Sequence, residues 1–178
     1  MRVIFVGGVH GVGKGTVCQE LSALFNLPHY SASTLIRNKK KGSTDERKVV
    51  VDAADNQDHL LSALGGLDTD ASTILLDGHF CLLGPEGIFE VPLSTFKGMG
   101  LVGIALIVDE VDEIEKRLES RDGNTLGKET IDSLQQREML RSSVIAEKVN
   151  VPLIKVRADE IDQLITWLEG ASIFGDRE

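Results

Sequence analysis

The sequence has few cysteines and no long apolar stretch. Cys18 and Cys81 are its only cysteines in 178 residues, whereas a disulfide framework needs more of them at closer spacing. We therefore expect two small buried side chains in a reducing compartment. No apolar run approaches the ~20 residues of a membrane-spanning helix, and no small-residue cleavage site of a secretory signal follows Val3–Val6. These absences predict a soluble, cytoplasmic protein without a membrane partner.

Positive charge is also scarce. The chain has 19 lysines and arginines against 28 acidic residues, so its formal net charge is -9 and its sequence pI about 4.9. Because proteins bind duplex nucleic acid through clustered lysines and arginines, we expect no such partner for this chain. A local basic patch would still suit a mononucleotide.

Short β-branched apolar runs alternate with longer helical patterns, which is typical of a parallel sheet wrapped by helices. The expected strands are Val3–Val6, His29–Ser31 (the weakest), Thr73–Leu76, Leu101–Val108 and Pro152–Val156. Helical spacing of apolar residues predicts helices over Lys14–Phe25, Gln57–Leu64, Val111–Arg121 and Lys128–Val149, and a last one carrying Ile161, Leu164, Ile165 and Leu168. The sequence thus predicts one α/β domain over residues 1–178, a three-layer fold with a five-stranded parallel sheet and helices on both faces.

Two segments do not follow this alternation. Asn38–Arg47 is rich in Lys, Gly, Ser and Thr and is expected to be a mobile, solvated segment. Gly84–Gly98 contains two prolines and three glycines and is expected to be an irregular loop after the third strand.

A glycine-rich loop follows the first expected strand. The run Gly8–Lys14 fits the pattern G-x-x-x-x-G-K-[ST], except that Gly15 precedes the hydroxyl residue Thr16. Glycines let the backbone N–H groups surround a phosphate, and the start of the next helix adds partial positive charge. Lys14 is expected to reach the β and γ phosphates, and Thr16 is the nearest hydroxyl for Mg²⁺. The loop therefore predicts binding of Mg·ATP by Gly8, His10, Gly11, Val12, Gly13, Lys14, Gly15 and Thr16.

Asp77 stands at the end of a buried strand, where ligands collect in open parallel sheets. A carboxylate at this place can orient Mg²⁺ through water, so Asp77 is a second candidate for the metal site. His79 follows two residues later and is either a ligand contact or a structural hydrogen-bonding group.

Arginines are paired at helical spacing in the second half of the chain. Arg117 and Arg121 lie four residues apart, and Arg137 and Arg141 repeat the spacing beyond the glycine-containing turn Asp122–Gly127. The turn is a candidate lid at about 121–129. The plainer alternative is that these arginines are exposed and pair with glutamates, each pair contributing little; the candidates are Glu113, Glu119, Glu138 and Glu147.

Over nearly its whole length the chain resembles the nucleoside monophosphate kinases, particularly the short archaeal-type adenylate kinases. The resemblance rests on Gly8–Leu24, on His29–Arg37, on Asp77-Gly78-His79 with the following Gly/Pro loop, and on the arginine pairs. It implies transfer of the γ-phosphate of ATP to a nucleoside monophosphate, with Arg37 on the acceptor phosphate in a helical part at about 31–64. It also implies that the catalytic arginines Arg117, Arg121 and Arg141 close over the migrating phosphoryl group beside Lys14 and Asp77, and that the protein forms a homo-oligomer.

Two other functions fit the same residues. The arginine that follows the aspartate in the long adenylate kinases is absent after Asp77, which favours a small-metabolite kinase of the shikimate or gluconate type. A hydroxyl acceptor needs a general base, and Asp77 is the well-placed candidate. An ATP-binding switch or accessory ATPase with a macromolecular partner would instead show slow hydrolysis that no small acceptor accelerates.

Overall fold

The centre of the protein is a parallel sheet. The computed structural model describes residues 1–41, 53–123 and 126–170. Five parallel strands form the sheet in the order β2-β3-β1-β6-β7. Their bounds are β1 (Arg2–Gly7), β2 (His29–Ser31), β3 (Thr73–Asp77), β6 (Leu101–Val108) and β7 (Leu153–Arg157). The predicted five-stranded α/β fold is confirmed, the weak strand included.

The register of the sheet brings three chain segments together at one edge. Val6 of β1 and Ser31 of β2 both lie opposite Asp77 of β3. The chain leaves all three strands at their carboxyl ends, which is where open parallel sheets bind ligands. The glycine-rich loop, the start of the next helix after Ser31 and the corner after Asp77 therefore meet there.

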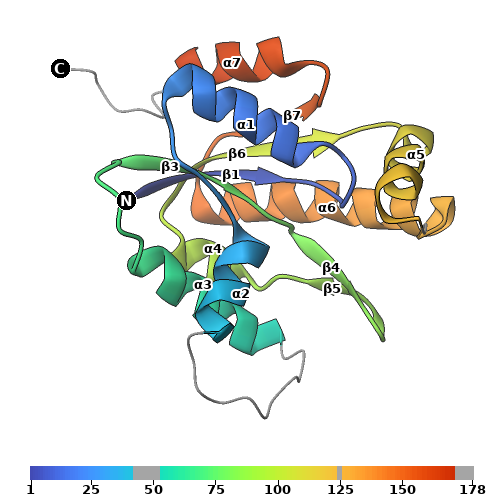
Figure 1. Ribbon diagram of the computed structural model, residues 1–178, viewed down its shortest axis with the longest axis horizontal. Coiled ribbons are helices and arrows are strands. Elements are labelled where there is room, and N and C mark those ends of the chain that lie inside the picture. Colours follow the sequence, from blue (N-terminus) through green and yellow to red (C-terminus); the bar gives the residue numbers. More distant parts are fainter. Residues whose placement is uncertain (42–52, 124–125, 171–178) are drawn as a thin grey trace.

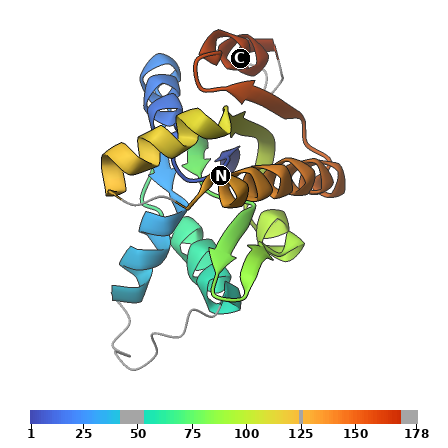
Figure 2. The same cartoon turned by 90° about the vertical axis from the view of Figure 1, so that its right-hand side faces the viewer.

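Helices cover both faces of the sheet (Figures 1 and 2). On one face lie α1 (Lys14–Phe25) and α7 (Ile161–Gly170), and on the other lie α3 (Ala53–Gly65), α4 (Leu93–Gly98) and much of α6 (Lys128–Val149). Side chains of a strand alternate between faces. In β1, Ile4 and Val6 pack with the first group and Val3 and Phe5 with the second.

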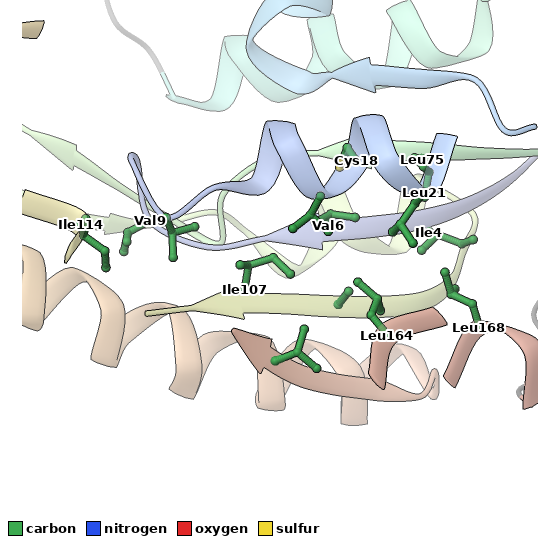
Figure 3. Close-up of a cluster of buried hydrophobic side chains, with 14 of the residues drawn as sticks. Ile4, Val6, Val9, Cys18, Leu21, Leu75, Ile107, Ile114, Leu164 and Leu168 are labelled. Carbon is green, nitrogen blue, oxygen red and sulfur yellow. The ribbon is translucent and has the colours of Figure 1, made fainter. Parts of the chain in front are cut away.

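The cluster under α1 and α7 is fully apolar and largely closed to solvent. Figure 3 shows Leu21 of α1, Leu164 and Leu168 of α7 and the strand residues Ile4 and Val6 converging on one another. Both cysteines are free and buried, as expected. Among the described helices, none combines the length and apolar character that crossing a membrane would require.

The expectation of an irregular loop over Gly84–Gly98 is wrong. The chain there forms the two-stranded hairpin β4 (Cys81–Gly84) and β5 (Gly87–Glu90), followed by α4. Gly87 has a φ of 112°, which an L side chain rarely adopts, and it closes the turn; Pro92 stands directly before α4. The glycines and prolines thus mark the ends of elements instead of interrupting them. Figure 1 shows the hairpin projecting away from the main sheet.

The expectation of a mobile, solvated segment over Asn38–Arg47 is partly wrong as well. Helix α2 (Ala32–Lys41) continues through its first four residues, and the rest of the segment lies outside the described residues. Helix α3 begins earlier than expected, and α2 and α3 fall in the span predicted as a helical part at about 31–64, whose acceptor-binding role stays a prediction. Helix α5 (Val111–Asp122) leads to the turn before α6. Residues 124–125 of the expected lid are not among those described.

Candidate active site

The glycine-rich loop connects β1 to α1. Gly8 and Gly11 have φ values of 142° and 82°. A Cβ atom on Gly8 would lie 2.5 Å from the carbonyl oxygen of Ile107, and one on Gly11 would lie 2.8 Å from Cγ of Leu118. Both positions therefore require glycine. A loop of this kind, at the start of a helix, presents backbone N–H groups to an anion.

Lys14 is buried within this loop. Its Nζ donates hydrogen bonds to the carbonyl oxygens of Gly8 at 2.7 Å and Val9 at 2.9 Å. Burial lowers the pKa of Lys14 to about 8, against the opposing influence of the negative charges of Glu138 and Asp77. The ammonium group is held by neutral carbonyl groups in a poorly hydrated place, which is a favourable arrangement for binding a phosphate.

A hollow of about 410 Å³ opens above the loop, and we call it the phosphate hollow. It brings together most of the predicted site: its lining residues are His10, Gly11, Gly13, Lys14, Gly15, Thr16, Ser31, Ser33, Asp77, His79, Arg117 and Arg121. Two other predicted loop residues do not line the hollow. The carbonyl oxygen of Gly8 accepts a hydrogen bond from Lys14, and Val12 is fully buried. A Cβ atom on Gly15 would meet nothing within 4 Å. Thr16, at the start of α1, is one of three residues that bring a hydroxyl group to the hollow, with Ser31 and Ser33, and its metal role stays a prediction.

Arg117 and Arg121 reach the phosphate hollow from α5. Nη2 of Arg117 donates to Oδ2 of Asp109 at 2.6 Å, and Nη1 lies 3.5 Å from the carbonyl oxygen of Gly11. Arg121 contacts the ring of His10. Both arginines line the hollow and add positive charge to it.

Asp109 was not predicted, and it fixes Arg117. It follows β6, its side chain is buried, and its second oxygen, Oδ1, pairs with Arg157 at 3.1 Å. Burial alone would raise its pKa, but hydrogen bonds from Arg117 and from the N–H of Glu110 hold it below its usual range. Gln135 of α6 holds the Asp109 backbone through both its N–H and its carbonyl group. An acid after a buried strand is the same signal that identified Asp77.

A second cavity, of about 270 Å³, adjoins the phosphate hollow, and we call it the side cavity. Its lining residues are Phe5, Ser31, Ala32, Ser33, Ile36, Asn56, Gln57, Leu60, Asp77, Gly78, His79, Leu82, Phe89, Val91, Thr95 and Met99. Four of these, Ser31, Ser33, Asp77 and His79, also line the phosphate hollow. Asp77 therefore stands where the two spaces meet.

Asp77 has a close partner in the neighbouring strand. Its Oδ2 lies 2.6 Å from Nε2 of His29. This contact fixes the carboxyl group at the junction of the two spaces. Cys18 of α1 completes a group of three potential metal ligands whose ligand atoms lie within 4.8 Å of one another. Burial raises the pKa of the Cys18 thiol far above its usual range, so it is a neutral thiol here and a poor ligand.

Glu138 of α6 is a buried carboxyl group near Lys14, so it does not fit the alternative in which it would pair with exposed arginines. Its side chain is 1% exposed. Oε1 accepts the N–H groups of Phe80 and Cys81 at 2.9 Å each, whereas Oε2 has no hydrogen-bond partner among the residues that the structure describes. Burial raises the pKa of Glu138 to about 7, although these N–H groups and the positive charge of Lys14 oppose the shift. Glu138 thus holds the corner that follows Asp77, and it contributes negative charge near Lys14 once it loses its proton near pH 7.

His79 lies close to both Glu138 and His10. Nδ1 of His79 is 3.8 Å from Oε1 of Glu138, and its ring stands 6.2 Å from that of His10. Burial, then the nearby charges of Lys14 and His10, lower the pKa of His79 to about 3. The ring is therefore neutral, and one of its nitrogens can donate a hydrogen bond into the adjoining spaces.

Replacing Glu138 by glutamine tests this burial. A folded-state pKa of about 7, raised from 4.5, means that the folded protein keeps a proton that the unfolded chain has lost. Wild-type stability contributed by this group therefore falls as pH rises from 4.5 through 7. Since glutamine does not ionise, the stability of Glu138→Gln relative to wild type should rise by about 1–3 kcal/mol between pH 5 and 8.

Urea unfolding at both pH values measures the difference. Glu147→Gln, an exposed change on the same helix, is the matched control and should show no such trend. If the stability of Glu138→Gln relative to wild type is constant or falls as pH rises, then Glu138 does not keep its proton in the folded protein.

Three predicted or paired arginines lie away from the phosphate hollow. Nη2 of Arg141 donates to the carbonyl oxygen of Val91 at 2.7 Å, and Nη1 pairs with Glu90, which also pairs with Arg137. Arg37 is exposed and donates to Oγ1 of Thr34 at 3.2 Å. Neither Arg141 nor Arg37 lines either space. The i, i+4 spacing identified a shared helix face for Arg137 and Arg141, but that face meets β5.

Comparisons with known proteins agree with this fold. No curated protein sequence matches the chain. The solved structures that share its fold include an uncharacterized protein from Eubacterium ventriosum, at 15% identity and a TM-score of 0.54, covering 96% of this chain and 99% of that one. They also include a gluconokinase from Sinorhizobium meliloti, at 17% identity and a TM-score of 0.54, covering 99% of this chain and 98% of that one. A third is a shikimate kinase from Acinetobacter baumannii in complex with shikimate, at 16% identity and a TM-score of 0.56, covering 94% of this chain and 92% of that one.

A family model described as an AAA domain matches residues 7–135. The match begins at the end of β1 and includes the glycine-rich loop, Lys14, Asp77, Asp109 and the α5 arginines. It covers more than half of the chain. The protein therefore belongs to this AAA-domain family, and its fold is that of the P-loop kinases.

Proposed function

We propose that the protein transfers the γ-phosphoryl group of Mg·ATP to a hydroxyl group of a small molecule held in the side cavity. One observation carries the proposal: Asp77 lines both the phosphate hollow and the side cavity. A carboxylate at that junction would reach both a donor phosphate in the hollow and an acceptor hydroxyl in the side cavity. The similarity in fold to a gluconokinase and a shikimate kinase supports phosphotransfer in general.

The phosphate hollow would hold the donor. The loop N–H groups, the start of α1 and Lys14 bind its phosphates, and Lys14 exchanges the carbonyl groups of Gly8 and Val9 for phosphate oxygens. Thr16 and Asp77 would hold Mg²⁺, Asp77 through water, and the ion would offset charge on the β and γ oxygens. Arg117, fixed by Asp109, and Arg121 would stabilise the charge of the transferred group.

Asp77 would act as the general base. The acceptor oxygen forms a bond to the γ-phosphorus while the bond from that phosphorus to the β,γ-bridging oxygen breaks, and ADP leaves. The hydroxyl proton passes to the Asp77 carboxylate. His29, hydrogen-bonded to Oδ2, holds the carboxyl group in place during this transfer.

A nucleoside monophosphate is the second candidate acceptor. Besides the resemblance, one observation favours it: α2, which carries Arg37, also contributes Ser33 and Ile36 to the side cavity. In the described geometry Arg37 is exposed and bonded to Thr34, so binding an acceptor phosphate would require it to turn inward.

Arg37→Ala separates the two candidates. For a hydroxyl acceptor we expect less than a twofold change in kcat/KM, because Arg37 lines neither space. For a monophosphate acceptor, the loss of a phosphate-binding arginine would lower kcat/KM by about 30-fold or more. Lys39→Ala, another exposed cation of α2, is the control.

The direct test is ADP production from Mg·ATP with and without a panel of acceptors. The panel holds uncharged alcohols and nucleosides, shikimate and gluconate, and the common nucleoside monophosphates. We expect an alcohol to raise the rate by orders of magnitude. Slow hydrolysis that no acceptor changes would refute the proposal and favour an ATPase with a macromolecular partner.

A further inference from the structure

We propose that the acceptor is an uncharged alcohol with a compact apolar body, and that it lies in the side cavity with its hydroxyl at Asp77. This inference rests on the proposed function and names the class of its substrate. It differs from both a nucleoside monophosphate and a sugar acid, each of which carries negative charge.

The side cavity is built mainly from apolar side chains. Phe5, Leu60 and Met99 are buried in its inner wall, where they belong to the core cluster on that face of the sheet. Leu82 and Phe89 lie opposite each other in the β4–β5 hairpin and also line the cavity. They are 40% and 39% exposed, which is high for large apolar side chains that face a hollow. An apolar body in the cavity would cover both of them.

Among the described residues, no lysine or arginine lines the side cavity. Three cations close to it are engaged with other groups. Lys14 donates to the phosphate loop, Arg141 contacts Glu90 and the carbonyl group of Val91, and Arg37 donates to Thr34. The cavity's own charged residue is acidic, because Asp77 stands at its mouth. A carboxylate or phosphate in this space would lose its hydration without gaining a lysine or arginine partner, and it would face the like charge of Asp77.

The remaining polar groups of the cavity are neutral. They are the hydroxyl groups of Ser31, Ser33 and Thr95, the amide groups of Asn56 and Gln57 and the neutral ring of His79. Oγ1 of Thr95 donates to Oε1 of Gln57 at 2.7 Å, which fixes this amide and directs its NH₂ group away from that contact. A small number of fixed, uncharged hydrogen-bonding groups in an apolar space suits a neutral ligand that must be oriented.

A matched pair of probes tests the inference without any turnover. Binding of cyclohexylmethanol and of cyclohexanecarboxylate is measured by NMR titration, with Mg·ADP present so that the phosphate hollow is filled. The two probes differ mainly in the charge at one end. We expect the alcohol to bind at least tenfold more tightly than the carboxylate.

Ile36→Arg reverses the expected preference. Ile36 lines the cavity from α2, so an arginine there supplies the missing cation, and the carboxylate should then bind at least as tightly as the alcohol. Leu140→Arg is the control, because Leu140 is 66% exposed on α6 and lines neither space. Thermal unfolding of both variants establishes that they are folded.

Each outcome is decisive. Tighter or equal binding of the carboxylate by the wild-type protein overturns the inference, and so does the absence of binding by both probes at millimolar concentration. Failure of the proposed function is distinguishable, because the preference is then present in the titration while the acceptor panel fails to stimulate ADP production.

Discussion

Replacing Asp77 by asparagine should lower kcat for a hydroxyl acceptor by about 10²- to 10⁴-fold, the usual contribution of a general base. Asparagine has nearly the same shape, and its carbonyl oxygen can still meet Nε2 of His29. What it loses is the ability to accept the proton of the hydroxyl group. The measurement is steady-state ADP production with the acceptor that stimulates it most.

Two controls give this prediction its meaning. Asp70→Asn changes an exposed carboxylate just before β3 and should leave kcat unchanged. Magnesium titration of Asp77→Asn separates the roles of the carboxylate: loss of a metal-orienting group is offset by more Mg²⁺, whereas loss of a base is not. A loss in kcat of less than tenfold would contradict the general-base role, since a phosphate acceptor is already an anion and needs no base.

Lys14→Ala should lower kcat/KM by about 10²- to 10³-fold, whatever the acceptor, because it removes the buried cation that we propose binds the transferred phosphoryl group. It should also weaken binding of ATP, which isothermal titration measures directly. Lys148→Ala, an exposed change on α6, is the matched control. Unchanged ATP affinity and unchanged kcat/KM in Lys14→Ala would mean that the phosphate hollow is not the donor site.

Lys14→Ala has a second expected effect that the buried position explains. In the protein without nucleotide, the ammonium group is held by two neutral carbonyl groups and its pKa is lowered by burial. Alanine removes the cost of keeping that charge in a poorly hydrated place. We therefore expect near-normal folding stability in a catalytically impaired variant, which urea unfolding checks.

Much of the fold could be predicted because its signals are local. The strand Val3–Val6 is a continuous apolar run, and the glycine-rich loop carries its own pattern directly after it. Asp77 could be predicted because the end of a buried parallel strand marks a place in the fold as well as in the sequence. The same rule applies to Asp109, which follows the strand Leu101–Val108, and it would have found the partner that fixes Arg117.

The rest of the site depends on contacts between distant segments. Glu138 stands in a helix among other charged residues, and nothing within that helix distinguishes it from exposed Glu147. Its burial follows from the corner at Phe80 and Cys81, 58 and 57 residues away, which offers two N–H groups. The side cavity likewise needs α2, α3 and the β4–β5 hairpin together, and that hairpin was expected to be an irregular loop.

The arginines illustrate the limit of spacing as a signal. Arg117–Arg121 and Arg137–Arg141 share the same four-residue interval, yet the first pair faces the phosphate hollow and the second faces β5. Spacing defines a common face of a helix but not what that face meets. The predicted catalytic role of Arg141 would require it to leave Glu90 and Val91, so it stays a prediction.

The fate of the γ-phosphate tests the central claim most directly. The wild-type protein is incubated with ATP labelled at the γ position, Mg²⁺ and the most stimulating uncharged alcohol, and the products are separated. We predict that most of the label is found covalently on the alcohol oxygen, and that Asp77→Asn and Lys14→Ala both abolish this product. Label found only as inorganic phosphate, in equal amounts with and without the alcohol, would contradict phosphotransfer by this protein.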